Sequence, residues 1–258
     1  AFTLHGTGTY IVGRGKVAVI DPGPDDDAHV QAILAAVEGE TVSHIVVTHT
    51  HRDHSPAARP LQEATGAPIW GCGPHGSGRG PAGEHTEEGA DRDYKPDVQM
   101  HDGDVLEGDG WTLQAVYTPG HTSNHTCFHL KEENVLFSGD HVMGWSTTIV
   151  SPPDGDMAAY LDSLRVVAGR ADHVAIPTHG PPIPDPSQFV GDLIAHRLDR
   201  ERQILAAVRS GTGSIAEMVE QLYVGVRREL YKPARRSVLA HLVKLVADGD
   251  VVHFRFNV

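Results

Sequence analysis

The chain has 258 residues, of which 40% are hydrophobic and 21% are charged, and this composition is typical of a soluble globular protein rather than a disordered one. Its net charge of −13 is uneven, because residues 1–186 carry 10 Lys and Arg against 26 Asp and Glu, whereas residues 187–258 carry 11 against 8. The first part should therefore repel polyanions, and the second part could tolerate them. No apolar run reaches the roughly 18 residues of a membrane span, no signal peptide is visible, and two cysteines cannot form a disulfide framework, so we expect a cytoplasmic protein that does not associate with membranes.

The chain begins with strand-like segments. Two β-rich runs at residues 8–13 and 16–23 are separated by a Gly-Arg-Gly turn, which predicts a hairpin. Residues 25–39 have acidic residues at their start, helical apolar spacing and a closing glycine, and these features predict a helix. Residues 44–49, HIVVTH, follow as a buried strand.

A helix is expected next at residues 55–66, with Ser55 as its N-cap, followed by a strand at 67–71. Residues 72–96 are rich in glycine and charge and have no clear period. Loops of this length are usually functional or mobile. The sequence therefore predicts one long loop in the first half of the chain.

Strands and helices continue to alternate up to residue 180. The pattern predicts strands at 111–120 and 173–180, a hairpin at 126–140, and a helix at 156–169. Such interleaving favours a layered α/β domain with mixed sheets. We place this domain at residues 1–183.

The proline-rich stretch GPPIPDPS at 180–187 is a candidate boundary, and residues 187–258 form a candidate C-terminal domain. Helices are predicted at 188–211, 214–226 and 233–249, and a short strand at 250–256. Three helices and a strand are typical of a winged-helix module. A plain helical buttress for the main domain is the alternative.

The segment THTHRDHS at residues 48–55 places His49, His51, Asp53 and His54 directly after an apolar strand. On an extended segment His49 and His51 lie on one side and can share an ion, while Asp53 and His54 follow the turn and can reach a second point. Imidazole and carboxylate are ligands that Zn²⁺, Fe and Mn accept. The cluster therefore predicts half of a metal centre.

Three further candidate ligands each follow a predicted strand in a tight turn that contains glycine. His121 lies in TPGHTSNH, Asp140 in LFSGDHV and His179 in IPTHG. Glycine permits a close backbone turn that leaves the neighbouring polar side chain at the strand end. Together with the first cluster they give two sets of three ligands and one carboxylate that can bridge them.

The motifs HTHRDH, PGH, SGD and THG, in this order, resemble those of the metallo-β-lactamase superfamily. TPGHTSNH, FSGDHVMGWSTT, PPDGDMAAYLDSL and the helical tail resemble more specifically the beta-lactamase-like protein 2 family, over nearly the whole chain. The resemblance implies an αββα sandwich with two divalent metal ions at one edge between the sheets. We expect Zn²⁺, with Fe or Mn as alternatives.

The resemblance also assigns the ligands. It implies that His49, His51 and His121 bind one metal, that Asp53, His54 and His179 bind the other, and that Asp140 bridges them. The loop that carries His49, His51, Asp53 and His54 is called the ligand loop below. Asp21 in VIDPGP matches an early aspartate that orients this loop, although it could simply close a turn before Pro22. Thr178 departs from the glycine found in many relatives, and we expect it to alter packing near His179.

Other polar residues near these motifs have open roles. His125 and His141 flank ligands and could support the ligands, contact substrate or belong to a strand or loop. Thr147 and Thr148 could line the cleft or simply belong to a strand. We expect Cys127 in the core, and we expect exposed side chains at His75, His85 and His101.

The expected activity is hydrolysis. Two cations about 3.5–4 Å apart lower the pKa of a shared water, so the nucleophile would be a metal-bridging hydroxide. Asp53 and Asp140 are the expected catalytic residues, with Asp53 accepting a hydrogen bond from that hydroxide. The presence of His51 and Asp140 argues against a diiron flavoprotein and against a true β-lactamase.

Three functions remain open. The first is a hydrolase of a small-molecule ester, thioester or lactone, and the second is an endoribonuclease acting on single-stranded RNA, the activity that the closer resemblance implies. The third, a non-catalytic nucleic-acid regulator, is disfavoured by the complete ligand set. A basic stretch in the C-terminal region could hold RNA, through Arg227, Arg228, Lys232, Arg235, Arg236 and Lys244. The sequence does not indicate an oligomeric state.

Overall fold

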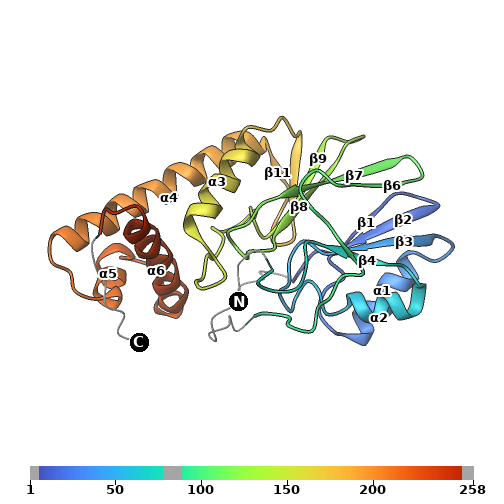
Figure 1. Cartoon of the computed structure of the whole chain (residues 1–258), viewed down its shortest axis with the longest axis horizontal. Coiled ribbons are helices and arrows are strands. Elements are labelled where there is room, and N and C mark those ends of the chain that lie inside the picture. The colour runs from blue at the N-terminus through green and yellow to red at the C-terminus, as the bar shows by residue number, and fades with distance from the viewer. Residues whose placement is uncertain (1–5, 78–88, 252–258) are drawn as a thin grey trace.

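The computed structural model describes residues 6–77 and 89–251, in which two β-sheets face each other (Figure 1). The first sheet has five strands in the order β1-β2-β3-β4-β5. Strands β2 to β5 pair in parallel, and β1 adds an antiparallel edge. Its strands are β1 (Tyr10–Val12), β2 (Lys16–Ile20), β3 (Thr41–Val46), β4 (Ile69–Gly71) and β5 (Val98–Gln99).

The second sheet has six strands in the order β11-β10-β9-β8-β7-β6. Only β9 and β10 pair in parallel, and the remaining pairs are antiparallel. Its strands are β6 (Val105–Gly108), β7 (Trp111–Tyr117), β8 (Thr126–Leu130), β9 (Val135–Gly139), β10 (Val174–Pro177) and β11 (Ile183–Pro184).

Both sheets are buried on both faces, which explains why their central strands are apolar at consecutive positions. In β2, Val17 and Val19 face one way and join a core with α1 (Asp27–Ala36) and α2 (Ala58–Thr65). Ala18 and Ile20 face the other way and join the core between the sheets. Helix α3 (Met157–Ala168) covers the outer face of the second sheet. These layers confirm the expected αββα sandwich.

The C-terminal region is helical and has a core of its own. It contains α4 (Pro186–Arg209), α5 (Ile215–Leu222), the short 3₁₀ helix η1 (Arg228–Leu230) and α6 (Tyr231–Ala247). The long helix α4 belongs to two cores, since Val190 packs in the core of α3 and Ile204 packs in the core of α5 and α6 (Figure 1). It therefore connects the sandwich to the C-terminal region and packs against both.

Three local predictions differ from the structure. The hydroxyl of Ser55 does not cap α2, because the ligand loop continues to Ala57 before the helix begins; it donates instead to Asp91 Oδ2, at 2.6 Å. Residues 180–187 are not a simple joint, since β11 and the start of α4 lie within them. The short strands β5 and β6 were not predicted, because so few residues show no clear period.

Other predictions fall outside the described residues. Most of the strand expected at 250–256 and residues 78–88 of the long loop lie there. The domain boundary at 183–187 stays a prediction. In the part of the chain that the structure describes, no helix is both long and apolar enough to cross a membrane.

Candidate metal centre

The predicted ligands meet at one edge of the sandwich, because each follows a strand that ends there. They form two groups, and within each group the candidate ligand atoms lie within 4.8 Å of one another. The first ligand group consists of His49, His51, His121 and Asp140, and the second ligand group of Asp53, His54 and His179. The structure thus brings together all seven residues that the sequence singled out, and their assignment to two metal ions stays a prediction.

In the first ligand group, three imidazole nitrogens converge. His51 Nδ1 lies 3.0 Å from His49 Nε2 and 3.0 Å from His121 Nε2. Asp140 Oδ2 lies 3.6 Å from His121 Nε2 and 4.0 Å from His49 Nε2. Three nitrogens and a carboxylate oxygen directed at one point are a donor set that suits a single divalent ion.

The second ligand group is arranged around two carboxylates. Asp53 Oδ2 lies 3.5 Å from His54 Nε2 and 3.3 Å from His179 Nε2. The other oxygen of Asp140, Oδ1, lies 3.7 Å from His54 Nε2 and 3.3 Å from His179 Nε2. Asp140 therefore turns one oxygen towards each ligand group.

The imidazoles are held from behind by hydrogen bonds. His121 Nδ1 donates to the carbonyl of Ile149 at 2.6 Å, and His179 Nδ1 donates to the carbonyl of Gly6 at 3.0 Å. His49 Nδ1 lies 3.0 Å from Thr48 Oγ1. Such contacts fix the tautomer and leave Nε2 free to bind an ion, as is usual for metal-bound histidine. The residues therefore fit the implied metal ions.

Asp21 makes the orienting hydrogen bonds that the resemblance implied. It is fully buried, with a backbone φ of +48°, and it accepts hydrogen bonds from Thr48 N at 2.8 Å and Thr48 Oγ1 at 2.7 Å. His54 Nδ1 lies 3.0 Å from its Oδ2. One carboxylate therefore fixes both the start of the ligand loop and one ring of the second ligand group.

Thr178 does more than alter packing. Its hydroxyl donates to Asp140 Oδ1 at 2.7 Å, and the residue is buried. Glycine at this position would lack that contact. The departure from many relatives therefore adds a hydrogen bond to the carboxylate between the two ligand groups.

The two flanking histidines are fully buried, so neither is placed to contact a substrate. His125 Nε2 accepts from the backbone N–H of Asp140 at 3.1 Å, and its Nδ1 lies 2.9 Å from Thr118 Oγ1. His141 packs against Tyr160, with ring centroids 5.1 Å apart. His125 thus supports a ligand, whereas His141 is a core residue.

The electrostatics of the site favour ionised carboxylates. Burial alone would raise the pKa of Asp140, but His54 and His179 outweigh it and hold that pKa well below its usual value. Burial would likewise lower the pKa of His179, but hydrogen bonds to Asp140 and Asp53 raise it to about 10. Burial and neighbouring imidazoles lower the pKa of His49, which favours the neutral ring that a metal requires.

The prediction that His75 is exposed was wrong. Its side chain is only 10% exposed, with Nδ1 3.0 Å from Thr50 Oγ1 and Nε2 4.0 Å from Asp154 Oδ2. Asn124 draws this segment onto the ligand loop by donating to the carbonyls of Gly73 and Pro74, at 3.1 and 3.3 Å. Sequence separation hides such a contact.

Other predictions near the site have mixed outcomes. His101 is exposed as expected, and His85 lies outside the described residues. Cys127 is fully buried, as predicted. Thr147 is exposed, whereas Thr148 is buried, and neither lies in a strand. The hydroxyl of Thr148 donates a hydrogen bond to the carbonyl of Asp140 at 2.8 Å.

Besides the Gly6 carbonyl behind His179, sequence reasoning missed two further contacts with the ligands. Thr7 Oγ1 donates to Asp53 Oδ2 at 2.9 Å, and the carbonyl of Ile149 accepts from His121. Backbone carbonyls carry no sequence signal, and a threonine 46 residues away is not marked by spacing.

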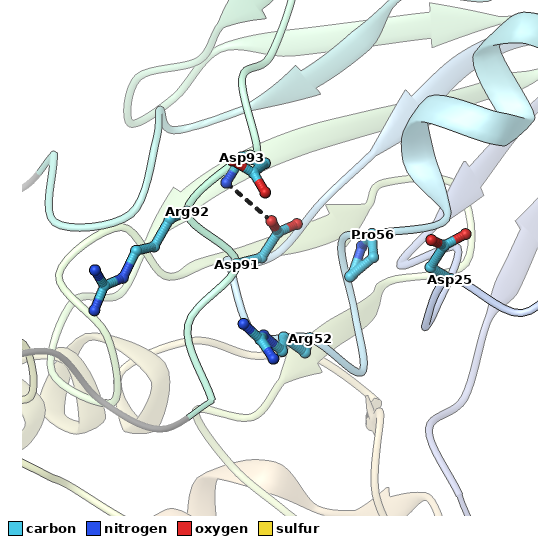
Figure 2. Close-up of a pocket in the computed structure, with 6 residues that line it drawn as sticks. All are labelled: Asp25, Arg52, Pro56, Asp91, Arg92 and Asp93. Carbon is cyan, nitrogen blue, oxygen red and sulfur yellow. Dashed lines mark hydrogen bonds between the residues drawn. The ribbon is translucent and has the colours of Figure 1, made fainter.

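A cavity of about 520 Å³ borders the ligand loop from outside (Figure 2). None of the seven candidate ligands lines it, although Arg52 lies between two of them in sequence. Asp91 lines this cavity and also accepts a hydrogen bond from Ser55 of the ligand loop. The lining residues are Asp25, Arg52, Pro56, Asp91, Arg92 and Asp93.

Comparisons with known proteins agree with this geometry. The family model of the metallo-beta-lactamase superfamily matches residues 3–179, and that of the beta-lactamase associated winged helix domain matches residues 214–255. The latter confirms the winged-helix-like character predicted for the C-terminal region.

Curated relatives match nearly the whole chain. It is 32% identical to the atrochrysone carboxyl ACP thioesterase AgnL7 of Paecilomyces divaricatus, covering 97% of this chain and 77% of that protein. It is 31% identical to a beta-lactamase-like protein 2 homolog of Caenorhabditis elegans, covering 99% and 84%. The crystal structure of a metallo-beta-lactamase family protein from Thermus thermophilus matches with a TM-score of 0.75 and 26% identity, covering 94% and 89%.

Proposed function

The chain belongs to the metallo-beta-lactamase superfamily of hydrolases, and we propose that it uses two divalent metal ions to hydrolyse an acyl thioester. The observation that carries the binuclear proposal is the position of Asp140. Its two oxygens face the two ligand groups, with Oδ2 3.6 Å from His121 Nε2 and Oδ1 3.3 Å from His179 Nε2. Such an aspartate suits a site for two ions and has no comparable use in a site for one.

The residues divide the chemical work. Bound in these groups, two ions would supply an activated water and polarise the carbonyl under attack. Asp53 is the only member of the second ligand group with a substantially exposed side chain, at 35%. Thr7 fixes one of its oxygens, so Asp53 can accept a hydrogen bond from the attacking water and set its direction.

We propose Zn²⁺ as the metal, because five imidazoles and two carboxylates match its usual ligands, and Fe and Mn accept the same set. His49, His51 and His121 with Asp140 would hold one ion. Asp53, His54 and His179 with the other oxygen of Asp140 would hold the second.

The substrate class rests on the relatives and on charge. A protein named as a thioesterase of an acyl carrier protein is 32% identical over nearly the whole chain. The acidic sandwich, where residues 1–186 carry 10 Lys and Arg against 26 Asp and Glu, disfavours a polyanion at the site. A thioester fits better than RNA on both counts.

Cleavage of single-stranded RNA remains the alternative, because a beta-lactamase-like protein 2 homolog is also a relative. The basic stretch that would hold RNA is weaker than its sequence suggests. The ammonium of Lys244 lies 2.9 Å from Glu201 and 2.6 Å from Asp248, so its charge is already paired.

A substrate panel tests the proposal. Zinc-loaded protein and a metal-stripped control would be given acyl thioesters of coenzyme A and of phosphopantetheine, a lactone, a β-lactam, a phosphodiester and a short RNA. We expect thioesters to give the largest kcat/KM, and only with metal present. Faster cleavage of RNA, with rates that fall steeply as salt is added, would favour the alternative. A protein that binds no metal would refute the binuclear proposal.

A further inference from the structure

Arg197 of α4 is a buried cation with an unusual set of partners. It is 3% exposed, and among the described residues it has no carboxylate within ion-pair distance. Its Nη2 donates to the carbonyl of Thr148, and its Nη1 donates to Ser237 Oγ of α6 at 3.3 Å. Its guanidinium also lies over the ring of Tyr160, 5.4 Å from the centroid. Arg197 thus joins the two long C-terminal helices to the sandwich.

The segment that Arg197 holds is in direct contact with the first ligand group. The hydroxyl of Thr148 donates to the carbonyl of Asp140 at 2.8 Å and to that of His141 at 3.1 Å. The next residue, Ile149, accepts the Nδ1 hydrogen of His121 at 2.6 Å. Residues 148 and 149 therefore fix two candidate ligands through one short stretch of backbone.

We propose that Arg197 is a positioning residue for the first ligand group, through which the C-terminal helices set the geometry of His121 and Asp140. The proposal rests on the binuclear function proposed above. It assigns the C-terminal region a part in the metal centre itself, in addition to any contact with substrate. The chain of contacts runs from Ser237 through Arg197 to Thr148 and Ile149, and from there to the two ligands.

The chemistry of the guanidinium supports this role over simple core packing. A buried charge without an opposite charge is costly, and an apolar side chain of similar volume would fill the same space more cheaply. The planar guanidinium has several N–H groups in a fixed arrangement, so it can hold a backbone carbonyl and a hydroxyl at the same time.

The same helix provides a matched control. Arg200 lies almost one turn further along α4, donates to the carbonyl of Leu222 at 2.7 Å, and stacks on Tyr223 with its carbon 4.2 Å from the ring centroid. It has the same kinds of partner as Arg197, but all of them lie in the C-terminal region. Its loss should therefore disturb helix packing without reaching either ligand group.

The experiment compares Arg197→Met, Arg197→Lys and Arg200→Met with the wild type. The affinity of the metal-free protein for each of two Zn²⁺ ions would be measured by competition with a chelator, beside thermal unfolding and thioester kinetics. Partners behind metal ligands typically contribute about 10–100-fold in affinity, and Arg197 acts one contact further out. We therefore expect Arg197→Met to weaken one of the two zinc sites about tenfold and to lower kcat more than it changes KM.

The remaining variants separate positioning from folding. Arg197→Lys should recover part of the lost zinc affinity, because an ammonium can still donate to the Thr148 carbonyl. Arg200→Met should lower the unfolding temperature and leave both zinc affinities unchanged. Should Arg197→Met fail to fold, Ser237→Ala removes only the α6 partner and should shift the same zinc site in the same direction by a smaller factor.

Two results would overturn the inference. The first is wild-type zinc affinities in folded Arg197→Met or, should that variant not fold, in Ser237→Ala. The second is equal losses of zinc affinity in Arg197→Met and Arg200→Met. Failure of the proposed function would look different. In that case the wild type itself would not bind two ions, or would bind them and hydrolyse no substrate while the Arg197 variants still weakened one zinc site.

Discussion

The two ligand groups share one aspartate but differ in how they are enclosed. Every residue of the first ligand group is buried, with at most 8% of its surface exposed. In the second ligand group the side chain of Asp53 is 35% exposed. The first group is enclosed between the sheet edge and the segment that the C-terminal helices hold. The second group opens towards solvent.

This difference implies two roles within one site. An ion in the first ligand group would be held by buried ligands that are themselves fixed from behind, such as His121 on Ile149. An ion in the second group would be easier to exchange and would lie on the side that a substrate approaches. In the proposed binuclear site, the first ion would therefore serve mainly as a fixed anchor, and the second would respond to substrate.

The change that should break this arrangement most severely is Asp140→Ala, since Asp140 faces both groups. We expect its activity to fall by clearly more than the roughly 10–100-fold that is typical of residues behind metal ligands. His125→Ala, which removes the acceptor for the Asp140 backbone N–H and the contact with Thr118 but no candidate ligand, should stay within that range. Thioester kinetics at equal metal content give the ranking, and similar losses in the two variants would show that Asp140 is not shared.

The second prediction separates the groups by stoichiometry. Elemental analysis of wild-type protein prepared without chelator should approach two metal equivalents. The double variant His54→Ala with His179→Ala should retain at most one, because the first ligand group is left intact. If that variant still bound two ions, or if the wild type bound none, the division of ligands into two groups would be wrong.

The sequence revealed the ligands because they are concentrated in short motifs at strand ends. His49, His51, Asp53 and His54 occupy one loop, and a chemistry that needs several imidazoles at one point leaves a visible cluster. The layered α/β architecture was predictable because strands and helices alternate along the chain and strands such as β2 are apolar over several consecutive residues. The αββα arrangement was implied by the family resemblance.

What supports the ligands was harder to predict. The carbonyls of Gly6 and Ile149 hold two imidazoles, and a carbonyl is present at every residue. Thr7 and Arg197 reach the site from distant parts of the chain, so no local spacing marks them. The burial of His75 depends on how a loop folds back, which composition does not determine.

The third prediction sharpens the comparison through Thr178, whose hydroxyl contacts the oxygen of Asp140 that faces the second ligand group. Thr178→Val keeps the shape of the side chain but removes this donor. We expect the affinity of the second zinc site to change by up to about tenfold and that of the first to stay constant. Chelator competition on the metal-free protein measures both. Equal changes at the two sites would mean that Asp140 responds as one unit.

The smallest effect on the site is expected from Glu201, which contacts neither ligand group. It lies 3.1 Å from His241 Nδ1 and 2.9 Å from Lys244 Nζ, between α4 and α6. Burial raises the pKa of Glu201, but hydrogen bonds from His241 and Lys244 outweigh it, and the net pKa is lowered.

The sign of the pH dependence follows from that lowered pKa. A carboxyl whose pKa is lower in the folded state stabilises the protein fully above its unfolded pKa of about 4.3, and the contribution is lost as the pH falls through the folded value. Glu201→Gln should therefore lower the free energy of unfolding by about 1 kcal/mol near neutral pH, as expected for a hydrogen bond to a charged group. Urea unfolding of metal-free protein should show this difference unchanged from about pH 7 to pH 5 and shrinking below about pH 4.

Because Glu201 touches none of the contacts that lead from Arg197 to the ligands, the Glu201→Gln variant should still bind two zinc ions. Loss of an ion from Glu201→Gln would show that the enclosure of the first ligand group depends on the whole packing of α4 against α6, and not on the single path through Arg197.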